Sequence, residues 1–439
     1  METDVSRADK PAFAGGRMRK RHHFALSAYW FATNLLWGAL LMVVVPSQMI
    51  DTLAPRNSAA VLGLLLGLGA IPALVVPLVV GPLSDRCMSR WGRRRPYMVG
   101  GTAVNLVGLF TLWFAGSRAN LALYFIGYFI TNIGNNIATG AYSGIIPDIV
   151  LVEQRGEASG WMAAMSQAGT IVGVVGTGVL MNMRQVAASY LMIGASMVVF
   201  LLISVLGVRE RPREVEPERM DWIGFVKSLW IDPRKYPDFA WVWVTRALVV
   251  MGLWTVQEYM QHFLTSVMGV KEADKEITAA IVLVIALACA TVTGLIGGSL
   301  SDRVGRKRVV YVSNAAVALT AVAFVYSPSL PMVYVVGAIF GLGFGAYYSV
   351  DWAMGCDVLP HKEEAAKDMA VWHVAFVLPQ SIALPIAGVI LSAFGRVDIA
   401  TSHGLITHYT RAGFTAIYAL AAAYLLLGAV LLRNVRGVK

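Results

Sequence analysis

Charged side chains are scarce in this sequence. Asp, Glu, Lys and Arg make up 14% of the 439 residues, whereas hydrophobic residues make up 57%. Soluble globular domains carry about 25% charged residues, so this chain has too few charges to cover a surface that faces water. The composition therefore excludes an ordinary soluble protein and predicts an integral membrane protein.

Cysteine is also rare, and the motifs of several enzyme classes are missing. Cys87, Cys289 and Cys356 have no paired spacing, which argues against a disulfide framework and a zinc site. The seven histidines are scattered and form no His-Glu-x-x-His motif. The sequence also lacks a nucleophile elbow and a phosphate-binding Gly-x-x-x-x-Gly-Lys loop. We therefore expect no enzymatic activity, no metal and no cofactor.

Long apolar segments fill most of the chain. Because backbone groups in lipid must be hydrogen bonded internally, each segment predicts a membrane helix. The twelve segments lie near 24–46, 58–83, 96–116, 120–146, 157–182, 187–208, 239–264, 275–300, 308–326, 330–356, 365–394 and 409–433.

Lys and Arg are distributed unevenly between the connections. Of the 36 Lys and Arg residues, 28 lie in the two tails and in the connections that follow every second segment, and six lie in the other connections. Cytoplasmic loops of membrane proteins carry such an excess, so both termini are predicted to be cytoplasmic. Topology then explains the net charge of +10, and no nucleic-acid partner is expected.

The longest connection divides the segments into six and six. The expected parts are a cytoplasmic tail 1–23, a bundle 24–208, a linker 209–238, a bundle 239–433 and a cytoplasmic tail 434–439. An amphipathic helix at the membrane surface is expected in the linker, with an ordinary cytosolic linker as the alternative. Its apolar face would hold Trp222, Ile223, Val226, Leu229 and Trp230.

Two motifs occur once in each half. GPLSDR at Gly81 recurs as GSLSDR at Gly298, each at the end of the second segment of its half. GAYSGIIPD ends at Asp148, and the related YYSVDWAMGCD ends at Asp357, each at the end of the fourth. Such a repeat is typical of transporters with a site near the middle of the membrane. We expect an all-α integral membrane protein with twelve transmembrane helices in two pseudo-symmetric six-helix bundles.

The loop GSLSDRVGRKR, residues 298–308, resembles the loop motif of the major facilitator superfamily. The first copy, SDRCMSRWGRRRP from Ser84, has four more residues between Arg86 and Gly92. This longer form is similar to that of sucrose transporters and of glycoside–pentoside–hexuronide cation symporters, as is SGIIPDIVLVEQRGEASGW from Ser143. The resemblance implies a secondary transporter in which the first, fourth, seventh and tenth helices line a central cavity.

The repeated loop predicts a charge latch on the cytoplasmic side. An aspartate at a helix end is stabilised by an arginine or by the N-terminus of a neighbouring helix. Such pairs hold one conformation and break in another. Anchoring of the arginines to lipid head groups is the alternative. The residues expected in the latch are Asp85, Arg86, Arg93, Asp148, Asp302, Arg303, Arg306 and Asp357.

Four ionisable residues are expected at membrane depth, namely Arg246, Glu258, Asp351 and His373. A charge there costs about 2.5–3.5 kcal/mol and usually faces a cavity or a partner. Arg246 and Asp351 are expected at similar depth, so we expect them to pair; two separate side chains that reach the interface are the alternative. The second segment lacks the carboxylates known in melibiose-type symporters, which favours protons over sodium. Glu258, Asp351 and His373 are then the candidates for coupling, although a solvated helix end would explain Glu258 and a structural hydrogen bond His373.

Amide and aromatic side chains on the expected cavity helices suit a polyhydroxylated ligand, and the fifth and eleventh segments add one glutamine each. Packing and hydrogen bonds between helices are the alternative for each of them. The candidate substrate-binding residues are Asn34, Trp37, Asn132, Asn136, Gln167, Trp254, Gln257, Tyr348, Trp352 and Gln380.

These observations predict a secondary active transporter of a small polar solute. We expect a sugar or glycoside to move with protons as the 24–208 half rocks against the 239–433 half, in a monomer that spans the cell membrane, which would be the cytoplasmic membrane in a bacterium. An exporter of drugs or other metabolites is the main alternative, although an exporter of apolar compounds would carry fewer amides. A receptor or scaffold that transports nothing is the remote alternative.

Overall fold

The computed structural model describes residues 18–53, 58–208, 210, 230–271, 275–361, 364–401 and 404–437. The chain forms two compact units. The first unit comprises Met1–Ile231 and Leu359–Val371, and the second comprises Asp232–Val358 and Trp372–Lys439. The segment Leu359–Val371, which was expected in the second bundle, therefore clusters with the first unit.

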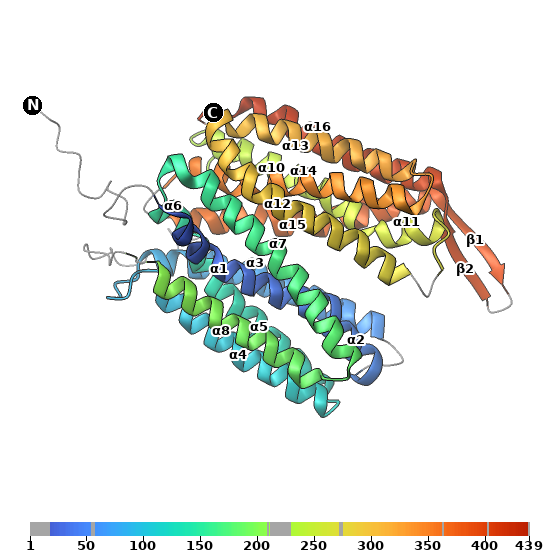
Figure 1. The fold of residues 1–439 in the computed structure, drawn as a ribbon, viewed down its shortest axis with the longest axis horizontal. Helices are drawn as coiled ribbons and strands as arrows, with labels where there is room; N and C mark the ends of the chain where they lie inside the picture. Colours follow the sequence, from blue (N-terminus) through green and yellow to red (C-terminus); the bar gives the residue numbers. More distant parts are fainter. Residues whose placement is uncertain are drawn as a thin grey trace, which may run out of the picture. The chain divides into compact units, whose positions relative to one another are not determined.

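The helices of the first unit run side by side (Figure 1). Apolar side chains on their surfaces can face lipid, which is why helices with such exposed faces are stable here. The elements are α1 (Lys20–Ala39), a π-helical turn (Leu40–Val44), α2 (Val45–Gln48), a second π-helical turn (Met49–Leu53), α3 (Ser58–Asp85), α4 (Arg95–Ser117), α5 (Leu121–Tyr142), α6 (Ile145–Ile149), a 3₁₀ turn (Val152–Gln154), α7 (Arg155–Asn182) and α8 (Val186–Gly207).

The second unit is also built from long helices that lie side by side (Figure 1). Helix α15 belongs to both units, because its first turn lies within Leu359–Val371. The elements are α10 (Pro237–Glu258), α11 (Met260–Ser266), α12 (Lys275–Val304), α13 (Arg306–Val325), α14 (Leu330–Asp357), α15 (Ala365–Gly395), α16 (Arg411–Leu431) and a 3₁₀ turn (Leu432–Asn434).

Within the described residues, the chain is all-helical apart from one short β-hairpin. Strands β1 (Arg396–Thr401) and β2 (Gly404–Tyr409) pair antiparallel, with Arg396 opposite Tyr409 and Thr401 opposite Gly404. The hairpin extends beyond the helix ends of its unit (Figure 1). It lies between α15 and α16, where only a short connection was expected.

Eleven helical spans within the described residues are long and apolar enough to cross a membrane, so the chain is a multi-pass membrane protein. The one expected segment that is not among these eleven spans lies near 120–146 and coincides with α5, which is 22 residues long. Asn132, Asn135 and Asn136 place three buried amides in this helix. Close packing compensates: a Cβ atom at Gly134 would lie 2.3 Å from the backbone nitrogen of Asn105, so α5 and α4 approach backbone to backbone.

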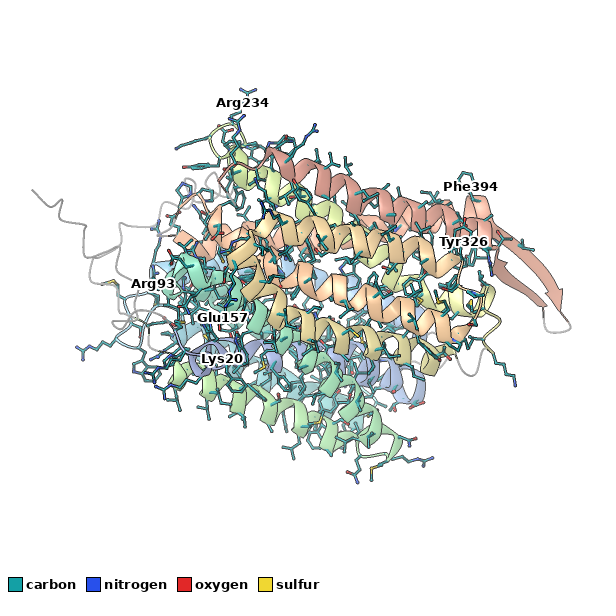
Figure 2. All side chains as sticks on the ribbon, turned by 45° about the horizontal axis from the view of Figure 1, so that its top comes forward. Lys20, Arg93, Glu157, Arg234, Tyr326 and Phe394 are labelled. Atoms are coloured by element: carbon teal, nitrogen blue, oxygen red, sulfur yellow. The ribbon has the colours of Figure 1, made fainter. Side chains whose placement is uncertain are left out.

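The ends of each unit carry the charged and interfacial residues. Figure 2 shows Lys20, Arg93 and Glu157 at the same end of the first unit, near the starts of α1, α4 and α7. Arg234 lies at one end of the second unit, and Tyr326 and Phe394 lie at its other end. The helix expected in the linker lies outside the described residues, except for Trp230, which is exposed.

Candidate functional site

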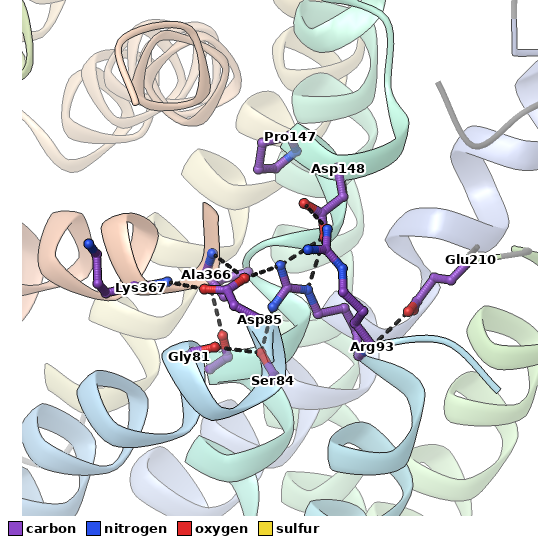
Figure 3. A network of polar contacts seen from close by, with 12 residues as sticks. Gly81, Ser84, Asp85, Arg93, Pro147, Asp148, Glu210, Ala366 and Lys367 are labelled. Carbon is purple, nitrogen blue, oxygen red and sulfur yellow. Dashed lines mark hydrogen bonds and ion pairs between the residues drawn. The ribbon is translucent and has the colours of Figure 1, made fainter. Parts of the chain in front are cut away.

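An arginine at the start of α4 lies between two aspartates in the first unit. The Arg94 side chain is fully buried. Its Nη2 lies 2.5 Å from Asp85 Oδ1 and 2.8 Å from Asp148 Oδ2, and its Nε donates to the same Asp148 oxygen at 3.0 Å. Nη1 donates to Ser84 Oγ at 2.6 Å. The cluster joins the C-terminal end of α3 to α6, which follows α5 (Figure 3).

The identity of the central arginine differs from the expectation. Arg93 was expected to hold the latch, but Arg94 is the arginine that lies on Asp85. Arg93 pairs with Asp148 at 2.9 Å and keeps 21% of its side chain exposed. Arg86, also expected in the latch, is half-buried and lies in electrostatic range of Glu364.

The Asp85 carboxylate also caps the start of α15. Its Oδ2 accepts the backbone N–H of Lys367 at 3.0 Å, and its Oδ1 accepts that of Ala366 at 3.3 Å (Figure 3). A carboxylate at a helix N-terminus is stabilised by the unpaired N–H groups and by the helix dipole. Gly81 permits this approach, because a Cβ atom there would lie 2.7 Å from the Ala366 carbonyl oxygen.

Glu210 closes the other side of the cluster. Its Oε2 accepts the backbone N–H of Arg94 at 2.8 Å, which caps α4. Gly92, with φ of +108°, makes room for it, since a Cβ atom there would lie 2.6 Å from the Glu210 side chain. Burial raises the pKa of the Glu210 carboxyl. Burial alone would lower the pKa of Arg94, but the carboxylates of Asp148 and Asp85 outweigh this effect and raise that pKa above its ordinary value.

The second unit contains a related cluster around Arg306. Its Nε lies 2.5 Å from Asp357 Oδ2, and its Nη2 lies 3.5 Å from Asp302 Oδ1. Gly305, with φ of +98°, precedes it as Gly92 precedes Arg93. Arg303, also expected in the latch, has an exposed side chain. Each unit therefore places one buried arginine between two aspartates. One aspartate lies at the end of the second long helix, and the other lies at the end of the fourth or just after it.

A second buried ion pair lies among the helices of the second unit. Arg246 Nη1 on α10 lies 2.6 Å from Asp351 Oδ2 on α14, and both side chains are almost completely buried. The structure thus brings together the pair expected from the sequence. The Tyr347 hydroxyl donates to Asp351 Oδ1 at 3.0 Å. The guanidinium carbon of Arg246 lies 3.2 Å from the ring centroid of Trp372, a contact that sequence reasoning missed.

The expected substrate residues of the first unit lie on α1, α5 and α7. Asn136 Nδ2 donates to Asn132 Oδ1 at 2.7 Å, and both side chains are buried. Asn34 donates to its own helix at the Trp30 carbonyl, and Trp37 contacts Tyr128 edge to face. The remaining candidate, Gln167, is buried on α7. Asn135, which was not predicted, is buried as well.

The substrate and coupling residues expected in the second unit lie in different surroundings. Trp352 is buried against Trp372, and Trp254 contacts Phe376, on which the His373 ring stacks. Tyr348 is half-buried, and its ring lies against Phe344. Gln257 is half-buried, and Glu258 is exposed at the end of α10. Gln380 lies in α15, and its side chain is outside the described part of the chain.

Known proteins resemble this chain in sequence and in fold. A sucrose transport protein of Arabidopsis thaliana is 23% identical over 182 residues, which are 38% of this chain and 35% of the relative. A general alpha-glucoside permease of Schizosaccharomyces pombe is 26% identical over 167 residues, 33% of this chain and 30% of the relative. The chain thus matches about a third of the length of these relatives.

The fold is shared with a solved transporter. The Escherichia coli fucose:proton symporter FucP superposes with a TM-score of 0.67 at 14% identity, covering 94% of this chain and 98% of that one. At this identity the likeness shows the fold alone. The family model of the major facilitator superfamily matches residues 24–294 and 274–438. The chain therefore belongs to the major facilitator superfamily.

Proposed function

We propose that this protein is a secondary active transporter that moves a sugar or a glycoside together with protons. In this proposal twelve membrane helices leave both termini in the cytoplasm, and the 24–208 half rocks against the 239–433 half about a site near the middle of the membrane. The observation that carries the proposal is the repeated cluster of two aspartates around a buried arginine, at Arg94 and at Arg306.

The first cluster supplies a contact that can form and break. Asp85 binds the first turn of α15, which clusters with the first unit. A rocking transporter requires contacts of this kind, which stabilise one state and are lost in the other. We propose that this cluster, which lies within the first unit, rearranges between the states of the transport cycle.

The sugar assignment rests on the relatives and on the amides of α5. The relatives are named for sucrose and alpha-glucosides, although each matches only a third of its length. An amide offers both a donor and an acceptor, as a sugar hydroxyl requires. Asn132 and Asn136 supply such groups at membrane depth. Trp37 and Trp254 would pack on the apolar faces of the sugar rings.

Transport in proteoliposomes tests the proposal. Radiolabelled sucrose and maltose should accumulate when the vesicle interior is made alkaline, and a protonophore should abolish the accumulation. Asn136→Ala should raise KM several-fold. Ser143→Ala, at the residue that caps the C-terminal end of α5, is the control, because its hydroxyl already donates to the Gly140 carbonyl. Exchange of another metabolite, with neither sugar bound or moved, would reject the sugar assignment.

A further inference from the structure

Three consecutive arginines lie at the start of α4, and each meets a different partner. Arg93 is partly exposed and pairs with one aspartate, whereas Arg94 is buried between two. Arg95 donates through Nη2 to the backbone carbonyl of Val208. Successive side chains on an α-helix point about 100° apart, so the position at which α4 begins decides which arginine enters the space between the aspartates.

The segment that leaves α8 contacts the start of α4 twice. Val208, the first residue after α8, is buried, and its carbonyl accepts the Arg95 side chain. Two residues later, Glu210 Oε2 accepts the backbone N–H of Arg94 at 2.8 Å (Figure 3). The absence of a Cβ atom at Gly92 lets the Glu210 side chain come this close. The segment therefore holds two successive residues, one by its backbone and one by its side chain, at the point where α4 begins.

The second unit repeats part of this arrangement. Lys307, the residue after the buried Arg306, donates through Nζ to the backbone carbonyl of Val435. Val435 is buried and directly follows the last helical turn of the second unit, as Val208 follows the last helix of the first. Two residues further on the chain has a glycine, where the first unit has a glutamate. The bond from a cation to the departing chain is therefore common to both units, and the carboxylate is particular to the first.

We infer that Glu210 is a positioning residue for transport: it sets the start of α4 so that Arg94, and neither of its neighbours, enters between the two aspartates. This inference rests on the proposed function, in which that cluster rearranges during the transport cycle. Glu210 lies in the connection 209–238, so the first residues of this connection take part in the cluster as well as joining the two bundles. Loss of Glu210 should destabilise the state that the cluster holds and slow the change between states.

The geometry of Glu210 separates its shape from its charge. Oε2 makes the bond to the start of α4, whereas Oε1 is buried and has no hydrogen-bond partner among the described residues. Glutamine keeps an acceptor oxygen and loses no second bond, whereas alanine removes the acceptor and leaves a buried N–H unsatisfied. A positioning role therefore predicts that glutamine replaces Glu210 and that alanine does not.

Uptake kinetics in proteoliposomes give the first test. Glu210→Ala should lower kcat for pH-driven uptake of sucrose or maltose several-fold and leave KM near the wild-type value, because no contact described for Glu210 involves a candidate solute residue. Glu210→Gln should restore most of the rate. Glu153→Ala, at an exposed glutamate of the same unit, is the control and should change neither constant. Full activity of Glu210→Ala, or a raised KM at unchanged kcat, would overturn the inference while the proposed function stands.

A double-mutant cycle on the apparent Tm gives an answer that does not depend on the solute. Glu210→Ala should lower the apparent Tm of wild type and should have a much smaller effect on Arg94→Gln, because most of its cost arises from a misplaced arginine. A simple helix cap would bind the backbone N–H in either background, so its loss would cost the same in both.

Additive shifts in this cycle overturn the inference, whether or not either sugar is moved. Glu210→Asp, which shortens the side chain by one methylene, takes the place of the alanine variant if that variant does not fold. If neither sugar moves, the proposed sugar transport fails, and the cycle still decides the role of Glu210.

Discussion

Asp85 Oδ2 accepts the backbone N–H of Lys367 at 3.0 Å, although 282 residues separate the two in the chain. The bond ties the end of α3 to the first turn of α15. The same carboxylate binds Arg94, so one buried anion satisfies both a helix N-terminus and a buried cation. Loss of this anion or of its arginine should therefore weaken the whole cluster.

The two neighbouring arginines should differ in their contribution to stability. Arg94 is fully buried between two carboxylates, and breaking a buried ion pair costs about 3–5 kcal/mol. Arg93 is partly exposed, and such a pair contributes about 0–1 kcal/mol. Arg94→Gln should therefore lower the apparent Tm of the detergent-solubilised protein much more than Arg93→Gln. Equal shifts would mean that Arg93 carries the latch, as the sequence first suggested.

Two glutamates next to the latch should give opposite pH effects. Burial raises the pKa of Glu210, so the folded protein holds its proton more tightly than the unfolded chain. Its stabilising contribution is complete below the ordinary glutamate pKa and is lost as pH rises through the raised value. As the pH rises through the raised pKa of Glu210, wild type should lose more stability than Glu210→Gln. The measurement is the apparent Tm of both proteins across the acidic to neutral range.

Glu364 provides the opposite case. Burial alone would raise its pKa, but the ammonium of Lys367 outweighs burial and the net pKa is lowered. Its contribution is present above the ordinary glutamate pKa and is lost as pH falls through the lowered value. Glu364→Gln should thus match wild type at low pH and fall below it at neutral pH. The difference in apparent Tm between variant and wild type should change with pH in opposite directions for the two glutamine variants. A change in the same direction for both would contradict the environments assigned to Glu210 and Glu364.

The sequence predicted the helices well and the contacts less well. Apolar runs near 96–116 and 187–208 correspond to Arg95–Ser117 and Val186–Gly207, because lipid demands a continuous apolar surface. The hairpin was missed because its strands are short and their alternation is weak. Several arginines follow Gly92, and the start of α4 determines which of them faces Asp85. The inserted residues before Gly92 obscure that start in the sequence.

The membrane-embedded pair was predictable for a different reason. A charge at membrane depth requires a partner, and Arg246 and Asp351 lie at matching positions on oppositely directed helices. Trp372, which lies over Arg246, could not be found in this way. From the sequence alone, a tryptophan in an apolar helix that contacts a cation looks the same as one that only packs against its neighbours. Its role depends on which helices are neighbours in space.

The ion pair can be tested by exchanging its charges. Arg246→Asp and Asp351→Arg should each lower stability by about 3–5 kcal/mol, because each leaves two like charges buried together. The double exchange restores opposite charges and should recover part of the loss. Full recovery is not expected, since the stacking on Trp372 and the bond from Tyr347 are not restored. The measurement is a double-mutant cycle on the apparent Tm, and a strictly additive cycle would reject the pairing.

Two glycines of α3 should respond differently to the same substitution. A Cβ atom at Gly81 would lie 2.7 Å from the carbonyl oxygen of Ala366, a backbone atom that cannot rotate away. Gly81→Ala should therefore push the first turn of α15 from Asp85, cost about 1–3 kcal/mol and slow transport.

Gly67 is the matched control on the same helix. A Cβ atom there would contact nothing within 4 Å, so Gly67→Ala should be neutral or stabilise α3 by up to about 1 kcal/mol. The apparent Tm and the initial uptake rate of both variants should be measured together. A Gly81→Ala protein that matches Gly67→Ala in both would show that the close approach of α3 to α15 contributes neither to stability nor to transport.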